Sequence, residues 1–242
     1  MSAELITLCS TAAGIGFIHT VLGPDHYLPF IAMSKARNWS AIKTSWITFL
    51  CGLGHVGASI LLGAIGIAIG SAADELLLGK LVWIESIRGD IAAWLLISFG
   101  LAYLIWGIRQ AIRNRPHTHR HLHGLGSQHT HNHTHEKEHL HVHDSKAKKN
   151  ITPWILFTIF IFGPCEPLIP VLMFPAVREM NIWAAVPVAI TFGVVTIATM
   201  LAVVGVISFG GNLLPGTRLV RYSHALAGGT IFACGIAIHM GL

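Results

Sequence analysis

Most of the chain consists of long apolar runs separated by shorter polar stretches. Each apolar run has about the 20 residues that a helix needs to cross a bilayer. The polar stretches include a mixed, charged segment at 71–90, which we expect to be a loop, and a hydrophilic insertion at 109–150. The pattern predicts an all-α membrane protein with six transmembrane helices, at residues 3–22, 45–70, 91–108, 152–176, 183–209 and 220–241.

Two of these apolar runs, the first and the fourth, are interrupted in the same way. The interruptions are Gly23-Pro24-Asp25-His26 and Gly163-Pro164-Cys165-Glu166. Glycine and proline both disfavour a continuous helix. Matching breaks in the two halves of a membrane protein point to a transport site. We therefore expect two inverted three-helix repeats, at 1–108 and 151–242, each starting with a helix broken at Gly-Pro.

Composition and charge agree with a membrane location. Of the 242 residues, 53% are hydrophobic and only 11% are charged, whereas soluble domains carry about 25% charged residues. The net charge of +5 comes from bases that flank the apolar runs, so it does not indicate nucleic-acid binding. The polar stretches after the first, third and fifth runs hold 13 Lys and Arg residues, against 3 on the other side. By the positive-inside rule, we expect the 109–150 insertion in the cytoplasm and both termini on the outer side of the inner membrane.

Several ionisable residues lie within or beside the apolar runs, where they are costly and usually functional. Imidazole and carboxylate groups suit borderline divalent metals such as nickel, cobalt and zinc. If the repeat brings the two breaks together near the midplane, side chains of the second break join the site. The candidate ligands are His19, Asp25, His26 and His55 from the first half and Cys165 and Glu166 from the second.

The 109–150 insertion is rich in histidine and too polar to need a packed fold. Such tracts bind metal ions, so we expect a disordered cytosolic loop that buffers metal. A pH-responsive segment is the alternative, because histidine titrates near neutrality. Its eleven histidines are His117, His119, His121, His123, His129, His131, His133, His135, His139, His141 and His143.

The segment His19–His26, HTVLGPDH, resembles the H-x4-D-H signature of nickel/cobalt permeases, with five residues rather than four before Asp25. Leu53-Gly54-His55 resembles their second signature. The six-span layout with a histidine-rich loop looks like the nickel/cobalt efflux branch and the related urease-accessory transmembrane proteins. The resemblance implies that His19, Asp25, His26 and His55 take part in metal selection. Pro164-Cys165 is similar to the membrane thiol-disulfide carriers of the same broad superfamily.

The sequence thus favours a gradient-driven transporter of a divalent metal, with Ni2+ or Co2+ efflux first and Zn2+ also compatible. We expect no enzymatic activity, no permanent cofactor and no nucleic-acid partner. The expected partners are the metal ion and the lipid bilayer, while a second copy of the chain or a metallochaperone is left open. Three alternatives remain: a thiol-disulfide electron carrier, an exporter of a small anion, and a metal-delivery or assembly factor for a metalloenzyme.

Overall fold

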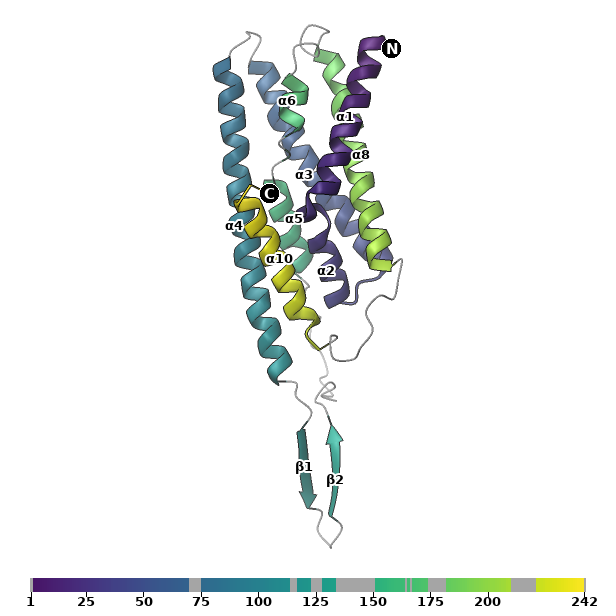
Figure 1. Ribbon diagram of the computed structural model, residues 1–242, viewed down its shortest axis with the longest axis vertical. Helices are drawn as coiled ribbons and strands as arrows, with labels where there is room; N and C mark the ends of the chain where they lie inside the picture. The colour runs from purple at the N-terminus through teal and green to yellow at the C-terminus, as the bar shows by residue number, and fades with distance from the viewer. Residues whose placement is uncertain are drawn as a thin grey trace.

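The computed structural model shows an elongated bundle of helices (Figure 1). It describes residues 2–69, 75–113, 117–122, 128–133, 151–163, 165, 167–173, 182–209 and 221–241. The first half contains α1 (Ala3–Leu22), the short 3-10 helix η1 (Pro24–His26), α2 (Leu28–Ala36), α3 (Ala41–Ile69) and α4 (Glu75–Arg113). The second half contains α5 (Thr152–Phe162), α6 (Leu168–Met173), α8 (Ile182–Phe209) and α10 (Ser223–His239).

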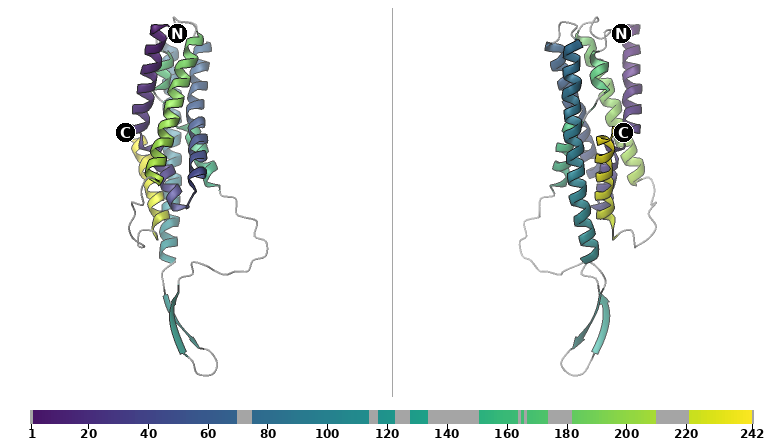
Figure 2. Two further views of the ribbon diagram at one scale, coloured as in Figure 1. Left: turned by 90° about the vertical axis from the view of Figure 1, so that its right-hand side faces the viewer. Right: turned by 60° about the vertical axis from the view of Figure 1, so that its left-hand side comes forward.

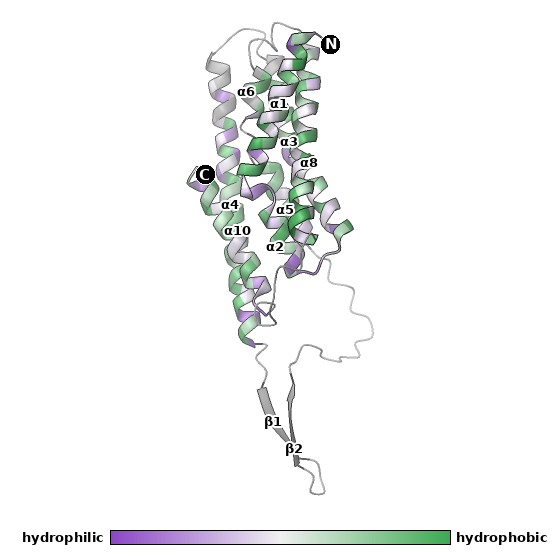
Figure 3. Cartoon of the chain, turned by 45° about the vertical axis from the view of Figure 1, so that its right-hand side comes forward, coloured by the Kyte–Doolittle hydropathy of each residue, from purple (hydrophilic) through white to green (hydrophobic). Residues whose placement is uncertain are grey.

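Four helices are long and apolar enough to cross a membrane, over Ala3–Leu22, Ala41–Ile65, Trp83–Arg113 and Trp183–Phe209. Their outward faces carry large apolar side chains, and Leu22 and Trp183 are about three-quarters exposed, at 74% and 75%. In water such exposed apolar side chains mark an interaction site, and Figure 3 shows hydrophobic residues along the helices of the bundle. The chain is therefore a membrane protein. The apolar helices α5 and α10 are shorter, at 11 and 17 residues.

The charged segment that we expected to be a loop at 71–90 is largely helical, so that prediction is wrong over 75–90. Helix α4 begins at Glu75 and runs unbroken for 39 residues to Arg113. The charges do not interrupt it because Glu85 and Arg88 stand three residues apart, on one face of the helix. Their side chains form an ion pair, with Oε2 of Glu85 2.5 Å from Nη1 of Arg88.

The bundle is all-helical, as predicted, in the part of the chain that the structure describes, and two short segments of the histidine-rich insertion pair as a β-hairpin. Strands β1 (His117–Leu122) and β2 (Gln128–His133) pair antiparallel. The alternation of histidine with other residues matches the two-residue period of a strand. A sequence too polar for a buried core is thereby compatible with a paired, extended backbone.

Helix α1 packs along α8, α3 packs against both α8 and α5, and α2 packs against α10. The ribbon views show α1 beside α8 over much of the bundle length (Figures 1 and 2). One buried cluster, centred on Phe30, Met33 and Phe160, joins α2 to α3, α5 and α10. A second, around Phe192 and Cys165, joins α1 to α6 and α8.

Helices α4 and α10 are in backbone contact through glycines. A Cβ atom on Gly100 would lie 2.3 Å from the backbone N of Phe232, and one on Gly228 would lie 2.3 Å from that of Leu104. Gly107 and Gly235, each seven residues further along its helix, also lie against the opposite backbone, where a Cβ on Gly235 would be 2.7 Å from the backbone N of Ile97. The absence of side chains at these positions lets the two antiparallel helices approach as small residues do in membranes.

We predict that Gly228→Ala will destabilise the protein by about 1–3 kcal/mol, because the added methyl group overpacks a contact that has only backbone to displace. The free energy of unfolding, measured by titration from mild detergent into SDS, checks this value. Gly57→Ala is the matched control, since a Cβ there meets nothing within 4 Å. Equal stability of the two variants would contradict the packing argument.

Candidate metal centre

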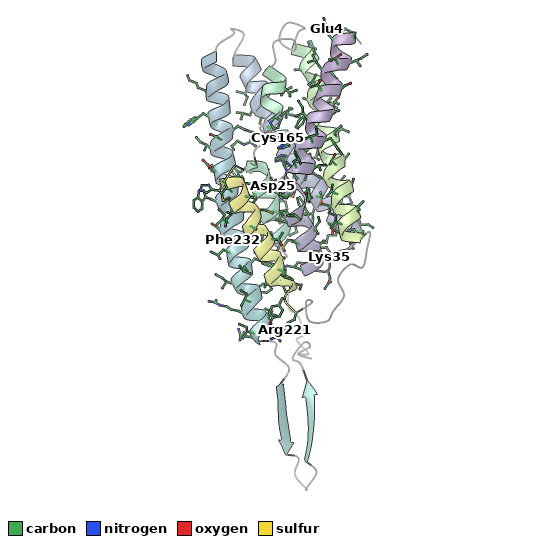
Figure 4. All side chains as sticks on the ribbon, in the orientation of Figure 1. Glu4, Asp25, Lys35, Cys165, Arg221 and Phe232 are labelled. Atoms are coloured by element: carbon green, nitrogen blue, oxygen red, sulfur yellow. The ribbon has the colours of Figure 1, made fainter. Side chains whose placement is uncertain are left out.

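The first Gly-Pro break places a histidine in the middle of the bundle. Helix α1 ends when the N–H of Gly23 donates to the carbonyl of His19 at 2.9 Å. Pro24 has no N–H to continue the helix, so the chain turns through η1 before α2 begins at Leu28. The turn leaves His26 only 2% exposed, and the labelled Asp25 marks its position midway along the bundle (Figure 4).

Three histidines from three elements meet there: His19 in the last turn of α1, His26 in η1 and His55 in α3. One ring nitrogen of each lies within 4.8 Å of the other two. The Nε2 atoms of His26 and His55 are 3.3 Å apart. The ring of His26 stands edge-on to both neighbours, with centroid distances of 4.7 Å to His19 and 4.9 Å to His55. We call these three residues the histidine triad.

The hydrogen bonds of His26 determine which of its nitrogens is free to bind. Its Nδ1 lies 3.1 Å from the carbonyl oxygen of Gly23 and 3.2 Å from Oδ1 of Asp25. A carbonyl can only accept, so Nδ1 carries the hydrogen and Nε2 presents its lone pair to the triad. This carbonyl is one that the helix break releases.

Two nitrogens of the triad are buried without a hydrogen-bond partner among the described residues, Nε2 of His19 and Nδ1 of His55. A buried polar atom left unsatisfied costs about 1–3 kcal/mol. Nε2 of His19 offers a lone pair that a divalent cation between the rings would take up, whereas Nδ1 of His55 lies on the side of Gly163 and the Nε2 of His55 is the nitrogen that faces His26. The donor set of the triad therefore fits a metal ion.

Asp25 is one of the expected ligands that the structure places differently. It is not one of the three residues whose ligand atoms converge, and its side chain is 24% exposed. Instead its carboxylate accepts from Nδ1 of His26. This is the carboxylate–histidine pairing that orients an imidazole and raises its basicity at metal sites. Asp25 thus contacts the triad through His26.

The glycines of both breaks make room for triad histidines. A Cβ on Gly23 would lie 2.6 Å from Nδ1 of His26, and a Cβ on Gly163 would lie 2.9 Å from Nδ1 of His55. Both distances are shorter than any normal contact, so any larger residue would push the imidazole away. The second break therefore closes over the triad although it contributes no histidine to it.

The other expected ligands lie apart from the triad or outside the described residues. Cys165 is fully buried in the cluster around Phe192 and is not part of the triad. Glu166 and Pro164 are outside the described residues. Of the loop histidines, His117, His119, His121, His129, His131 and His133 lie on β1 and β2, whereas His123, His135, His139, His141 and His143 are outside the described part.

The sequence analysis missed three polar residues that lie close to the second break. Ser59 of α3 and Glu85 and Arg88 of α4 form a buried hydrogen-bonded cluster that reaches the backbone of residues 161–165. The signal that could have found them is the opposite charges three residues apart in a segment otherwise apolar enough to be membrane helix.

Three imidazoles in a water-poor site suit the borderline divalent metals, from cobalt and nickel to copper and zinc. Neutral imidazoles do not offset the positive charge of an ion. The nearby negative charge is the carboxylate of Asp25, which is hydrogen-bonded to His26. In comparisons with known proteins, no family model, no curated protein and no solved structure matches the chain. The chemistry of the centre is therefore argued from its geometry alone.

We predict that Gly163→Ala will weaken binding of Co2+ at the triad by about tenfold or more, the loss typical when a ligand's supporting group is disturbed. The added methyl group displaces the imidazole of His55, while all three histidines of the triad are retained. The visible absorption of bound Co2+, titrated in detergent, reports the affinity. Gly14→Ala on α1, where a Cβ meets nothing within 4 Å, should bind as the wild type does. Wild-type affinity in Gly163→Ala would contradict the fit.

Proposed function

We propose that the protein transports a divalent transition-metal ion across the membrane, with Ni2+ or Co2+ as the first candidates and export as the direction. The observation that carries the proposal is the histidine triad, buried where a membrane helix is broken. Intramembrane ionisable groups beside interrupted helices are the usual substrate sites of secondary transporters. Three nitrogen donors match borderline divalent metals better than Mg2+ or Ca2+, which take oxygen ligands.

An inverted repeat is consistent with the packing of the helices. In the proposed scheme, α1 with α2 corresponds to α5 with α6, α3 corresponds to α8, and α4 corresponds to α10. The contact of α1 with α8 then mirrors that of α5 with α3. The antiparallel pair α4 and α10 lies across the proposed two-fold axis, and its glycines contact the opposite backbone reciprocally. Six spans follow if α5 and α6 together form one broken span and the 17-residue α10 forms another.

The orientation proposed for export follows from the distribution of basic residues. The histidine-rich insertion then lies in the cytoplasm and both termini lie outside. There the insertion collects ions at the inner end of the pathway. Transport is driven by an ion gradient, because the sequence contains no nucleotide-binding motif.

The hairpin gives the insertion a specific geometry for metal. Its register pairs His117 with His133, His119 with His131 and His121 with His129. The register thus sets six histidines of the insertion opposite one another as three cross-strand pairs. We propose that these six histidines buffer the metal, as histidine-rich tracts do.

The decisive experiment is metal flux into proteoliposomes that hold the purified protein, with Ni2+, Co2+, Zn2+, Cu+ and Fe2+ as separate substrates. Wild type should give saturable flux of Ni2+ or Co2+. His26→Ala and His55→Ala should reduce it to background, because each removes a ligand. Asp25→Asn should weaken the apparent affinity for the metal by about 10–100-fold but retain flux at high metal concentration. This is the effect expected of a residue that hydrogen-bonds to a metal ligand.

His239→Ala is the matched control for the flux measurement. His239 is a histidine at the end of α10 whose ring lies 5.1 Å from that of Trp94, away from the triad. It should transport as the wild type does. Normal flux in His26→Ala, or an absence of flux for every metal with folded wild-type protein, would refute the proposed function.

We predict that replacing the six hairpin histidines by Asn will lower the number of Ni2+ ions bound per chain but will leave saturable flux in place. The reason is that these six histidines are separate from the triad. Equilibrium dialysis in detergent gives the stoichiometry. The control replaces the other five histidines of the insertion, and an equal loss of binding there would show that the paired register has no role.

A thiol-disulfide carrier is the second candidate, and one observation favours it. Cys9 of α1 packs against the same buried cluster that contains Cys165, so the first half does offer a cysteine on that side. Cys165→Ser distinguishes the two functions. A metal transporter retains flux in this variant, whereas a carrier loses its activity and its ability to form a mixed disulfide.

A further inference from the structure

A second polar cluster lies in the membrane region, and the proposed ion site does not include it. It consists of Ser59 on α3 and Glu85 and Arg88 on α4. Glu85 is 2% exposed and the Arg88 side chain is 15% exposed. Burying charged groups is costly unless they are paired and hydrogen-bonded. The contacts of the cluster show what offsets that cost.

Among the described residues, each hydrogen bond of the pair either lies within the cluster or reaches the second helix break. Oε1 of Glu85 accepts from the Ser59 hydroxyl at 2.9 Å and from the backbone N–H of Cys165 at 2.9 Å. Arg88 Nη1 donates to Oε2 of Glu85 at 2.5 Å and to the Ser59 hydroxyl at 3.2 Å. Its Nη2 donates to the carbonyls of Ile161 at 2.8 Å and Gly163 at 3.3 Å.

These bonds replace the ones that the break removes. The last carbonyls of a helix have no partner within the helix, and the bilayer interior offers no water to satisfy them. The guanidinium is a planar fork that can donate to several oxygens at once. Arg88 thus satisfies the carbonyl of Ile161 in α5 and that of Gly163, and Glu85 satisfies the N–H of Cys165.

The segment bound in this way is the one that packs on the histidine triad. Gly163, whose carbonyl Arg88 binds, lies so close to His55 that a Cβ would be 2.9 Å from Nδ1. His55 also contacts Phe160, with ring centroids 6.2 Å apart. A shift of the break away from α4 would therefore open the side of His55 that faces it.

We propose that Glu85 and Arg88 are positioning residues that hold the α5–α6 break against His55 and thereby set the metal affinity of the triad. The part that concerns metal rests on the proposed function. The part that concerns the break does not, because it predicts a local opening whether or not metal binds. The two parts are tested separately.

The first test measures the break directly, by the rate at which a maleimide modifies Cys165 in detergent, with the modified residue identified by mass spectrometry. Cys165 is 0% exposed in the intact structure, and Glu85 binds its backbone N–H. Arg88→Gln and Arg88→Lys should raise the rate at least tenfold, since Lys keeps the charge but lacks the fork. Asp90→Asn, which removes an exposed charge from the same helix, should leave it unchanged.

Cys51 is the internal control for folding. It is 1% exposed, in the cluster around Phe30, away from the break. Slow modification of Cys51 together with fast modification of Cys165 supports local opening. If Arg88→Gln unfolds, so that both cysteines react quickly, Arg88→Lys and Ser59→Ala decide the result. Cys165 reacting as slowly as in the wild type in these folded variants would overturn the proposal.

The second test measures the triad in the same full-length variants. The Co2+ absorption that wild type shows and His55→Ala lacks defines the signal of the triad. Arg88→Lys should lower the affinity of this signal about 10–100-fold, as supporting groups at metal sites do, with unchanged unfolding in SDS. Unchanged affinity would overturn the link to His55, whereas a wild type without the signal would instead refute the proposed function.

Discussion

The requirement that every backbone group in a bilayer find a partner within the protein governs this structure. An unbroken helix without proline meets the requirement by itself, and α3 and α4 do so over their apolar windows. The two breaks do not. At the first break the free carbonyl of Gly23 accepts from the backbone and ring of His26. At the second, the carbonyls of Ile161 and Gly163 accept from Arg88. Each break is thus stabilised by a side chain, that of His26 at the first break and that of Arg88 at the second.

The two breaks are similar in sequence but are stabilised by different means. The first uses a residue of its own, which also presents its other nitrogen to the triad. The second uses a residue of α4, and its contribution to the triad is the space beside His55 that Gly163 leaves open. One Gly-Pro break thus carries a histidine of the triad, and the other confines one.

The features that could be predicted from the sequence are those that depend on local pattern. Apolar length predicted α3 and α8 within a few residues, and the Gly-Pro pairs lie where α1 and α5 end. The spacing of His19, His26 and His55 did not show that their nitrogens converge, since that depends on how α3 packs beside the break. Glu85 and Arg88 were assigned to a loop because their charge outweighed the apolar residues around them. Their pairing with the backbone of a segment some 75 residues away is a tertiary contact that no local pattern contains.

The glycine contacts between α4 and α10 also restrict how the molecule can move. Glycine meets the opposing backbone at four points, and on each helix the glycines are seven residues apart. A relative slide of the two helices would bring side chains into the backbone of the neighbour until the next matching register. At 1.5 Å per residue, that register is about 10 Å away. Small sliding steps are therefore blocked, and α4 and α10 form one rigid unit within the bundle.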